Sequence, residues 1–220
     1  MTLRAQLHVL VDPTLSRGRP LQEIVEAALA GGADVIQLRD KTAEPRELAA
    51  FLARALPRVR AAGARLLVND HWELACDGGA DGVHVGARDT PVARVRRACP
   101  TPFIIGASAR TVQTAKRATE AGADYLGVGP VFGTSSKPDA PAAIGLARIS
   151  ELAADARIPL IGIGGIGSTN VADVIRAGAA GVAVLSAVTA ATDPVEATRA
   201  LRRALDAVIP PRVAGSGPDC

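Results

Sequence analysis

The sequence predicts an α/β fold, a single (β/α)8 barrel, and two observations support that prediction. The first is a pattern that occurs four times, in which a small-residue turn is followed by a β-branched apolar run. Such a pattern is typical of a helix that ends on glycine and leads into a short strand covered on both faces. The four copies read GGADVIQL from Gly31, GGADGVHV from Gly78, AGADYLGV from Ala121 and AGAAGVAV from Ala177.

The second observation is that strand and helix segments alternate eight times along the 220 residues. Strict alternation indicates parallel strands joined by right-handed crossovers. Eight such units in a chain of this length favour a closed barrel, a TIM barrel. An open doubly wound sheet is the alternative. It usually needs a glycine-rich turn after the first strand, whereas here the first strand runs into Val11-Asp12-Pro13.

Four strands follow the repeated turns, and four more apolar runs complete the set, at 7–11, 65–69, 103–107 and 160–164. Helical periodicity predicts the intervening helices, and several have start signals such as Asp193-Pro194. These helices are expected at 21–30, 46–61, 72–76, 92–98, 112–121, 146–154, 171–177 and 194–208. The barrel should span residues 1–209, and the Pro-, Gly- and Ser-rich residues 210–220 should form a flexible tail.

The composition is that of an ordinary soluble globular protein, with 21% charged and 48% hydrophobic residues. The net charge of +3 is spread along the chain, which argues against a nucleic-acid partner. The three cysteines, at positions 76, 99 and 220, lack the paired spacing of a zinc site. We find no secretory segment or apolar run of membrane-spanning length, so we expect a cytoplasmic protein without a membrane partner.

A long loop with polar side chains is predicted within residues 127–145, between the sixth strand and the next helix. It carries Thr134, Ser135, Ser136 and Lys137 in succession. Short hydroxyl donors and a flexible ammonium group suit an anionic ligand. Because chemistry in such barrels takes place at the carboxyl ends of the strands, the other strand ends should face the same ligand.

A site for a phosphate monoester is predicted between the seventh and eighth strands. Gly164-Gly165 and the following Gly167-Ser168-Thr169 offer bare backbone N–H groups and a helix N-terminus. Leu185-Ser186 ends the eighth strand and should lie against the same phosphate.

A magnesium site is predicted beside it, because Asp70 and Asp89 follow neighbouring strands and can share one hard cation with phosphate oxygens and water. Arg39, Lys41 and Lys137 should surround the same space with positive charge. These charges exceed what a monophosphate requires and indicate a diphosphate, whose departure the metal and the cations would assist.

The histidines are expected to play a lesser part. His8 and His84 lie within or at the ends of predicted strands, which favours packing or hydrogen bonding over catalysis. No nucleophile elbow, Walker loop, HExxH or dinucleotide fingerprint occurs in its required strand–turn–helix context.

Seven segments of the chain form a recognisable set: QLRDK (37–41), ND (69–70), ADGVHVG..D.P (80–91), GAS (106–108), GADYLGVGPVFGTSSK (122–137), GIGGI (162–166) and LSAV (185–188). Through these segments the chain resembles the thiamine-phosphate synthase family over residues 7–207. The resemblance implies a TIM barrel that joins an aminopyrimidine methyl diphosphate to a thiazole phosphate with one Mg²⁺ per active site, releasing diphosphate.

The resemblance also implies roles for single residues. Asp70 and Asp89 would hold the magnesium. Thr134, Ser136, Gly165 and Ser186 would surround the thiazole phosphate. The family mechanism is dissociative, so Arg39, Lys41, Lys137 and Ser108 would act by positioning and charge stabilisation. The pyrimidine diphosphate would contact Gln37, Arg39, Lys41, Asn69, Ser108 and Lys137.

Three positions depart from the family pattern. Ala87 replaces a common glutamine, Arg110 a common histidine, and Ser136 the second threonine of a TxTK element. The alternatives are a thiazole tautomerase on the same barrel, a non-catalytic phosphate-ligand sensor, and a phosphosugar isomerase or epimerase. The tautomerase would place a catalytic histidine where Arg110 stands. The sequence is compatible with a homo-oligomer and fixes no subunit number.

Overall fold

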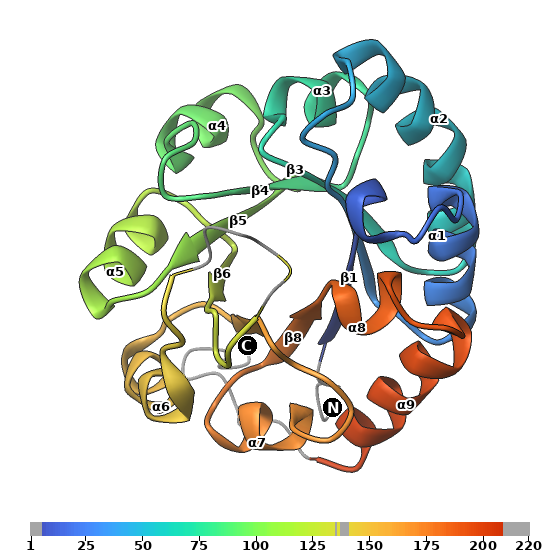
Figure 1. The fold of residues 1–220 in the computed structure, drawn as a ribbon. Helices are drawn as coiled ribbons and strands as arrows, with labels where there is room; N and C mark the ends of the chain where they lie inside the picture. The colour runs from blue at the N-terminus through green and yellow to red at the C-terminus, as the bar shows by residue number, and fades with distance from the viewer. Residues whose placement is uncertain (1–5, 135, 137–140, 209–220) are drawn as a thin grey trace, which may run out of the picture.

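A computed structural model describes residues 6–134, 136 and 141–208 of the chain (Figure 1). Eight parallel strands form a closed barrel in the order of the sequence, and β1 pairs with β8 to close it. The predicted barrel is therefore confirmed, and the open sheet is excluded. The strands are β1 (Gln6–Val11), β2 (Val35–Leu38), β3 (Arg65–Asn69), β4 (Gly82–Val85), β5 (Ile104–Ala109), β6 (Tyr125–Val128), β7 (Leu160–Ile163) and β8 (Gly181–Val184).

All eight expected helices are present and encircle the strands (Figure 1). Their ends lie within two residues of the predicted ends. The two longest, α2 and α9, start with a proline in the first turn, as is common where no N–H is needed. The helices are α1 (Leu21–Ala30), α2 (Pro45–Ala61), α3 (Trp72–Asp77), α4 (Val92–Ala98), α5 (Val112–Glu120), α6 (Gly145–Asp155), α7 (Val171–Arg176) and α9 (Pro194–Asp206).

Several predicted boundaries were wrong. β5 extends to Ala109 instead of ending at residue 107, because the small residues of GASA hide its strand pattern. β7 ends at Ile163, since Gly164 has a positive φ of 97°. Two short elements, the 3-10 helix η1 (Pro13–Leu15) and the helix α8 (Ser186–Thr189), were not predicted because they are too short to show periodicity.

The core has two layers, one outside the barrel strands and one inside the barrel. Side chains at alternate positions of β1 point to opposite faces of the strand. Leu7, Val9 and Val11 point outward and pack in the large cluster that includes buried residues of the helices. Leu10 lies in a smaller cluster inside the barrel, together with Val35, Leu67, Tyr125, Ile161, Ala183 and Leu185. The barrel interior is thus filled with side chains, as expected for this fold, and His8 points into it.

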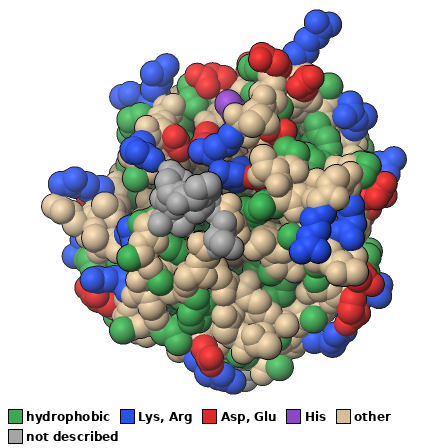
Figure 2. All heavy atoms as spheres, in the orientation of Figure 1, with side chains coloured by type: hydrophobic (Ala, Val, Ile, Leu, Met, Phe, Trp, Pro, Cys, Tyr) green, Lys and Arg blue, Asp and Glu red, His purple; other side chains and the backbone are tan. Residues whose placement is uncertain are grey.

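The face shown in Figure 2 carries basic and acidic side chains interspersed around its edge. Among the described residues, no helix combines the length and the apolar character needed to cross a membrane. The predicted tail, residues 210–220, lies outside the described part of the chain.

Candidate active site

A cavity of about 960 Å³ is lined by residues from all eight strands or from the loops that follow them. Its size is typical of small-molecule sites. Every predicted site residue that the structure describes lines this cavity. These residues are Gln37, Arg39, Lys41, Asn69, Asp70, Asp89, Ser108, Thr134, Ser136, Gly165, Leu185 and Ser186. Lys137 and Ser135 lie outside the described residues.

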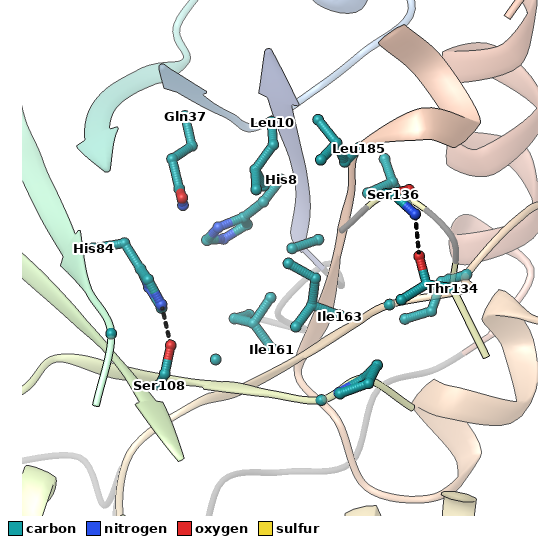
Figure 3. Close-up of a pocket in the computed structure, with 18 of the residues that line it drawn as sticks. His8, Leu10, Gln37, His84, Ser108, Thr134, Ser136, Ile161, Ile163 and Leu185 are labelled. Atoms are coloured by element: carbon teal, nitrogen blue, oxygen red, sulfur yellow. Dashed lines mark hydrogen bonds between the residues drawn. The ribbon is translucent and has the colours of Figure 1, made fainter. Parts of the chain in front are cut away.

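The cavity floor is made of polar and aromatic side chains from the barrel interior (Figure 3). The two ring nitrogens of His84 lie 3.0 Å from the Tyr125 hydroxyl and 3.0 Å from the Ser108 hydroxyl. The His8 and Tyr125 rings meet edge to face, with centroids 5.3 Å apart. Gln37 is almost fully buried beside them. The floor can therefore bind an uncharged ring that carries hydrogen-bonding groups.

Burial keeps two floor groups in their neutral forms. Burial, with a smaller contribution from the charge of His84, lowers the pKa of His8 to about 3. Burial also raises the pKa of the Tyr125 hydroxyl. Both side chains are consequently uncharged at neutral pH.

Two glycines make room for these rings. A Cβ atom on Gly106 would lie 2.1 Å from Cζ of Tyr125, and one on Gly127 would lie 2.6 Å from Cε1 of His84. Any side chain at either position would displace a ring. The glycines of GAS and of YLGV therefore set the shape of the floor.

A carboxylate pair lies on one wall of the cavity. Asp70 follows β3 directly with a positive φ of 66°, which aspartate tolerates better than most residues. Its carboxylate lies 3.5 Å from the Lys41 ammonium and interacts with the Asp89 carboxylate. Asp89 in turn accepts a hydrogen bond of 2.7 Å from the Gly86 N–H. The sequence places Asp89 four residues beyond β4, and this hydrogen bond turns it back toward Asp70.

The two carboxyl groups titrate as a pair. Burial, followed by the hydrogen bond and negative charge of Asp89, raises the pKa of Asp70. Burial alone would raise the pKa of Asp89, but hydrogen bonds with Asp70 and the Gly86 N–H and the charge of Lys41 lower it overall. A pair of crowded carboxylates of this kind is stabilised by a bound cation.

The carboxylate pair fits a magnesium ion that also takes substrate oxygens. Mg²⁺ is commonly bound through one or two carboxylates, with phosphate oxygens and water filling the other positions. Among the described residues, no group of three or more His, Cys, Asp or Glu side chains is placed to hold a metal. Two carboxylates would leave the other positions around such an ion to water or to ligand oxygens.

Arg39 is held by a partner that the sequence did not indicate. Its guanidinium forms an ion pair with the buried carboxylate of Asp12, whose other oxygen accepts hydrogen bonds from Thr14. The Arg39 side chain is 11% exposed, whereas that of Lys41 is 60% exposed. Arg39 is therefore a fixed cation at the end of β2, and Lys41 is a mobile one.

The opposite wall carries hydroxyl groups and close-packed glycine backbone. Ser136 after β6 and Ser186 at the start of α8 are joined by a hydrogen bond of 2.9 Å between their hydroxyls. The Ser136 N–H donates to the Thr134 hydroxyl at 3.2 Å. A Cβ on Gly165 would lie 2.5 Å from the Gly133 carbonyl oxygen, so only glycine permits this loop to pack on the end of β7. The strand-six loop is thereby fastened to strands seven and eight.

All three departures from the family pattern, Ala87, Arg110 and Ser136, line the cavity. Arg110 donates a hydrogen bond of 2.8 Å to the Ala142 carbonyl oxygen, which ties the start of α5 to the end of the strand-six loop. The hydrogen bonding expected of His8 and His84 is confirmed. Their position in the cavity was missed, although alternation along β1 and β4 places both inside the barrel.

Comparison with known proteins gives one consistent result. The family model for thiamine monophosphate synthase matches residues 7–188. A thiamine-phosphate synthase from Natronomonas pharaonis is 44% identical over 212 residues, which are 96% of this chain and 99% of that protein. One from Methanoculleus marisnigri is 48% identical over 158 residues, 72% of this chain and 75% of the relative.

A solved structure agrees in fold and sequence. Thiamine phosphate pyrophosphorylase from Pyrococcus furiosus superposes with a TM-score of 0.86 at 36% identity, covering 93% of this chain and 97% of that one. A 3-hexulose-6-phosphate synthase with a TM-score of 0.63 and 20% identity shares the fold alone. From the full-length matches we conclude that the chain belongs to the thiamine monophosphate synthase family and is an enzyme, a transferase of that family.

Proposed function

We propose that the protein joins an aminopyrimidine methyl diphosphate to a thiazole phosphate, giving thiamine phosphate and diphosphate. The observation that carries this proposal is that the cavity has two polar walls of different chemistry. Carboxylates and cations line one wall, and hydroxyls with glycine backbone line the other. Such an arrangement suits two phosphorylated substrates that meet over a shared floor.

The first wall would bind the diphosphate. Asp70 and Asp89 would hold Mg²⁺, which when bound neutralises charge on the diphosphate oxygens. Arg39 and Lys41 add positive charge from the end of β2 and the loop after it. Lys41 already lies 3.5 Å from the Asp70 carboxylate, so it can move toward a diphosphate without leaving the site. Lys137 remains a sequence-based member of this group.

The second wall would bind the thiazole phosphate. Thr134 and Ser136 in the loop after β6 and Ser186 at the start of α8 offer hydroxyl donors, and the Ser136–Ser186 hydrogen bond holds two of them together. Gly165 packs against Gly133 of the same loop, and Leu185 packs inside the barrel. Hydroxyl and N–H donors of this kind bind phosphate without adding charge.

The reaction requires little proton transfer from the protein. The bond between the pyrimidine methylene carbon and the diphosphate oxygen breaks, and the electron pair leaves with the diphosphate. The thiazole nitrogen then forms the new carbon–nitrogen bond. Gln37, Ser108, His84 and Tyr125 would position the pyrimidine, while the cationic wall stabilises the departing charge. Positioning and electrostatics would supply the rate enhancement.

The test is an assay of purified protein with both phosphorylated substrates and Mg²⁺, in which thiamine phosphate is detected by fluorescence after oxidation. The expected product appears only when protein, both substrates and Mg²⁺ are all present. Folded protein that forms no product above the protein-free control would refute the proposed function. The cytoplasmic location and the oligomeric state stay predictions from sequence.

A further inference from the structure

His8 has a buried ring nitrogen that no described residue pairs with. The residue lies on β1, is 2% exposed and lines the cavity. Its Nε2 is 3.0 Å from Oε1 of Gln6, whereas its Nδ1 has no hydrogen-bond partner among residues 6–134, 136 and 141–208. Most buried polar side-chain atoms are paired, and an unpaired one carries a desolvation penalty. An unpaired nitrogen at the wall of a binding cavity is therefore a candidate for contact with a ligand.

The contacts of His8 define which kind of group it can bind. Oε1 of Gln6 can only accept a hydrogen bond, so Nε2 carries the proton and donates it. Nδ1 of the neutral ring then holds the lone pair and is an acceptor. Its ligand must present a donor, such as an amino N–H, at the cavity floor.

The orientation of the ring is fixed by its surroundings. The edge-to-face contact with Tyr125, at an interplanar angle of 68°, and the Gln6 hydrogen bond hold the imidazole from two sides. The hydroxyl of Tyr125 lies at hydrogen-bond distance from His84, which leaves Nδ1 of His8 for a ligand. Figure 3 shows the His8 ring in the cavity, next to Gln37 and across from His84. Because the His8 ring is held in one orientation, its Nδ1 can distinguish ring ligands that present a hydrogen-bond donor from those that do not.

We propose that His8 is a specificity-determining residue, whose Nδ1 accepts a hydrogen bond from the exocyclic amino group of the aminopyrimidine substrate. This inference rests on the proposed function, since the aminopyrimidine is one of its substrates. The side chain binds and orients the ring and takes no part in bond breaking. A ring with hydrogen in place of the amino group would leave Nδ1 unpaired and would bind less well.

The test compares two His8 variants with two probes. His8→Phe keeps a flat ring and removes both nitrogens, and His8→Asn keeps an amide oxygen near the position of Nδ1. The probes are an unphosphorylated amino-hydroxymethyl-pyrimidine and its analogue without the amino group, with binding measured by calorimetry. We expect the wild-type protein to prefer the amino compound by about tenfold, the value of one good hydrogen bond. His8→Phe should lose most of this preference and His8→Asn should recover part of it.

Steady-state kinetics separate recognition from a merely structural role. His8→Phe should raise the KM for the pyrimidine diphosphate by about tenfold and leave the KM for the thiazole phosphate unchanged. Its melting temperature should equal or exceed that of the wild type, because an unpaired buried nitrogen is removed. A lowered melting temperature with both KM values raised would overturn the inference and assign His8 a packing role.

The outcomes also separate this inference from the proposed function. Wild-type protein that makes thiamine phosphate while His8→Phe retains the full amino preference overturns the His8 assignment alone. Wild-type protein that makes no product but prefers the amino probe, with the preference lost in His8→Phe, refutes the synthase activity and supports the amino contact. Equal binding of the two probes by the wild type overturns the assignment.

Discussion

At the level of single residues, the Asp70–Asp89 pair is the feature on which the proposed chemistry depends. The two residues follow different strands, and a hydrogen bond from the Gly86 N–H brings the later one back to the earlier one. Burial, followed by the closeness of Asp89, raises the pKa of Asp70, and a bound divalent cation would offset this crowding of carboxylates. Lys41 lies close enough to respond to what is bound there.

Asp70→Asn should reduce turnover by about a hundredfold or more, because one anionic metal ligand becomes a neutral amide. The fold should be retained, since the amide has the size of the carboxylate. Turnover is measured at saturating substrates over a range of Mg²⁺ concentrations. Asp173→Asn, on the outer surface of α7, is the matched control and should behave as the wild type. If Asp70→Asn retained wild-type turnover, the proposal that Asp70 is a metal ligand would be refuted.

Lys137→Ala tests a residue identified from sequence alone, in the TSSK segment. Loss of its positive charge should slow turnover by orders of magnitude and weaken binding of the pyrimidine diphosphate, because charge on the leaving group is less well stabilised. The comparison is with Lys116→Ala, which removes an exposed lysine of α5. Equal activity of the two variants would remove Lys137 from the site.

His8 should also affect the pH dependence of stability. Its pKa is lowered to about 3 in the folded protein from 6.5, so between these values the unfolded chain binds more protons. Stability therefore falls as pH drops from about 6.5 toward 3, by up to about 1.4 kcal/mol per pH unit from this group. Urea unfolding of the wild type and His8→Phe between pH 7 and about 4.5 measures it. Parallel curves for the two proteins would contradict the buried neutral state of His8.

At the level of elements, the described residues of the loop between β6 and α6 are fastened to the end of β7 and to α8. Its first residues pair with the end of β7, through hydrogen bonds from the Val131 and Phe132 N–H groups. Its last residues return to the same place, since the Ile144 N–H donates to the Pro130 carbonyl oxygen. Ser136 then reaches Ser186 of α8. These hydrogen bonds hold the hydroxyl groups of the loop in place above the cavity floor.

Ser186→Ala should raise the KM for the thiazole phosphate by about tenfold and leave the KM for the pyrimidine diphosphate unchanged. The reason is that it removes one hydroxyl donor and the bond that holds Ser136. Ser150→Ala, on the exposed side of α6, is the control for a serine that does not line the cavity. A rise in the other KM alone would assign Ser186 to the diphosphate wall.

The elements that could be predicted are those with a repeating signal. The four GGAD-like turns and the apolar runs between them predicted all the strands, because each is buried on both faces. Elements such as α8 depend on tertiary contacts, since its four residues contain no periodicity. The ion pair of Arg39 with Asp12 joins residues 27 positions apart, so no local pattern could indicate it.

At the level of the whole molecule, the closed barrel brings distant strand ends to one cavity. The predicted residues that the structure describes line one cavity for this reason, because once eight strands are recognised their carboxyl ends must meet. The floor was harder to predict, since His8, His84 and Tyr125 look like ordinary strand residues in sequence. Their place in the floor became visible only from the structure, through the contacts among the three rings and the closeness of Gly106 to Tyr125 and of Gly127 to His84.

Gly106→Ala tests this packing. The new methyl group would lie 2.1 Å from Cζ of Tyr125, and the ring would have to move inside a filled barrel. We expect a loss of about 1–3 kcal/mol in unfolding free energy, the usual cost of overpacking a core. Chemical denaturation measures it, with Gly167→Ala as control because no atom lies within 4 Å of the place its methyl group would take. Equal stability of the two variants would show that the floor can relax.

The proposal that one cavity binds a diphosphate and a monophosphate and joins their carriers is tested most directly by product stoichiometry. Purified protein is given both substrates and Mg²⁺, and thiamine phosphate and released diphosphate are measured in the same samples. We expect equal amounts of the two products, and loss of both in Asp70→Asn. Diphosphate release without thiamine phosphate, or neither product from folded wild-type protein, would contradict the proposal.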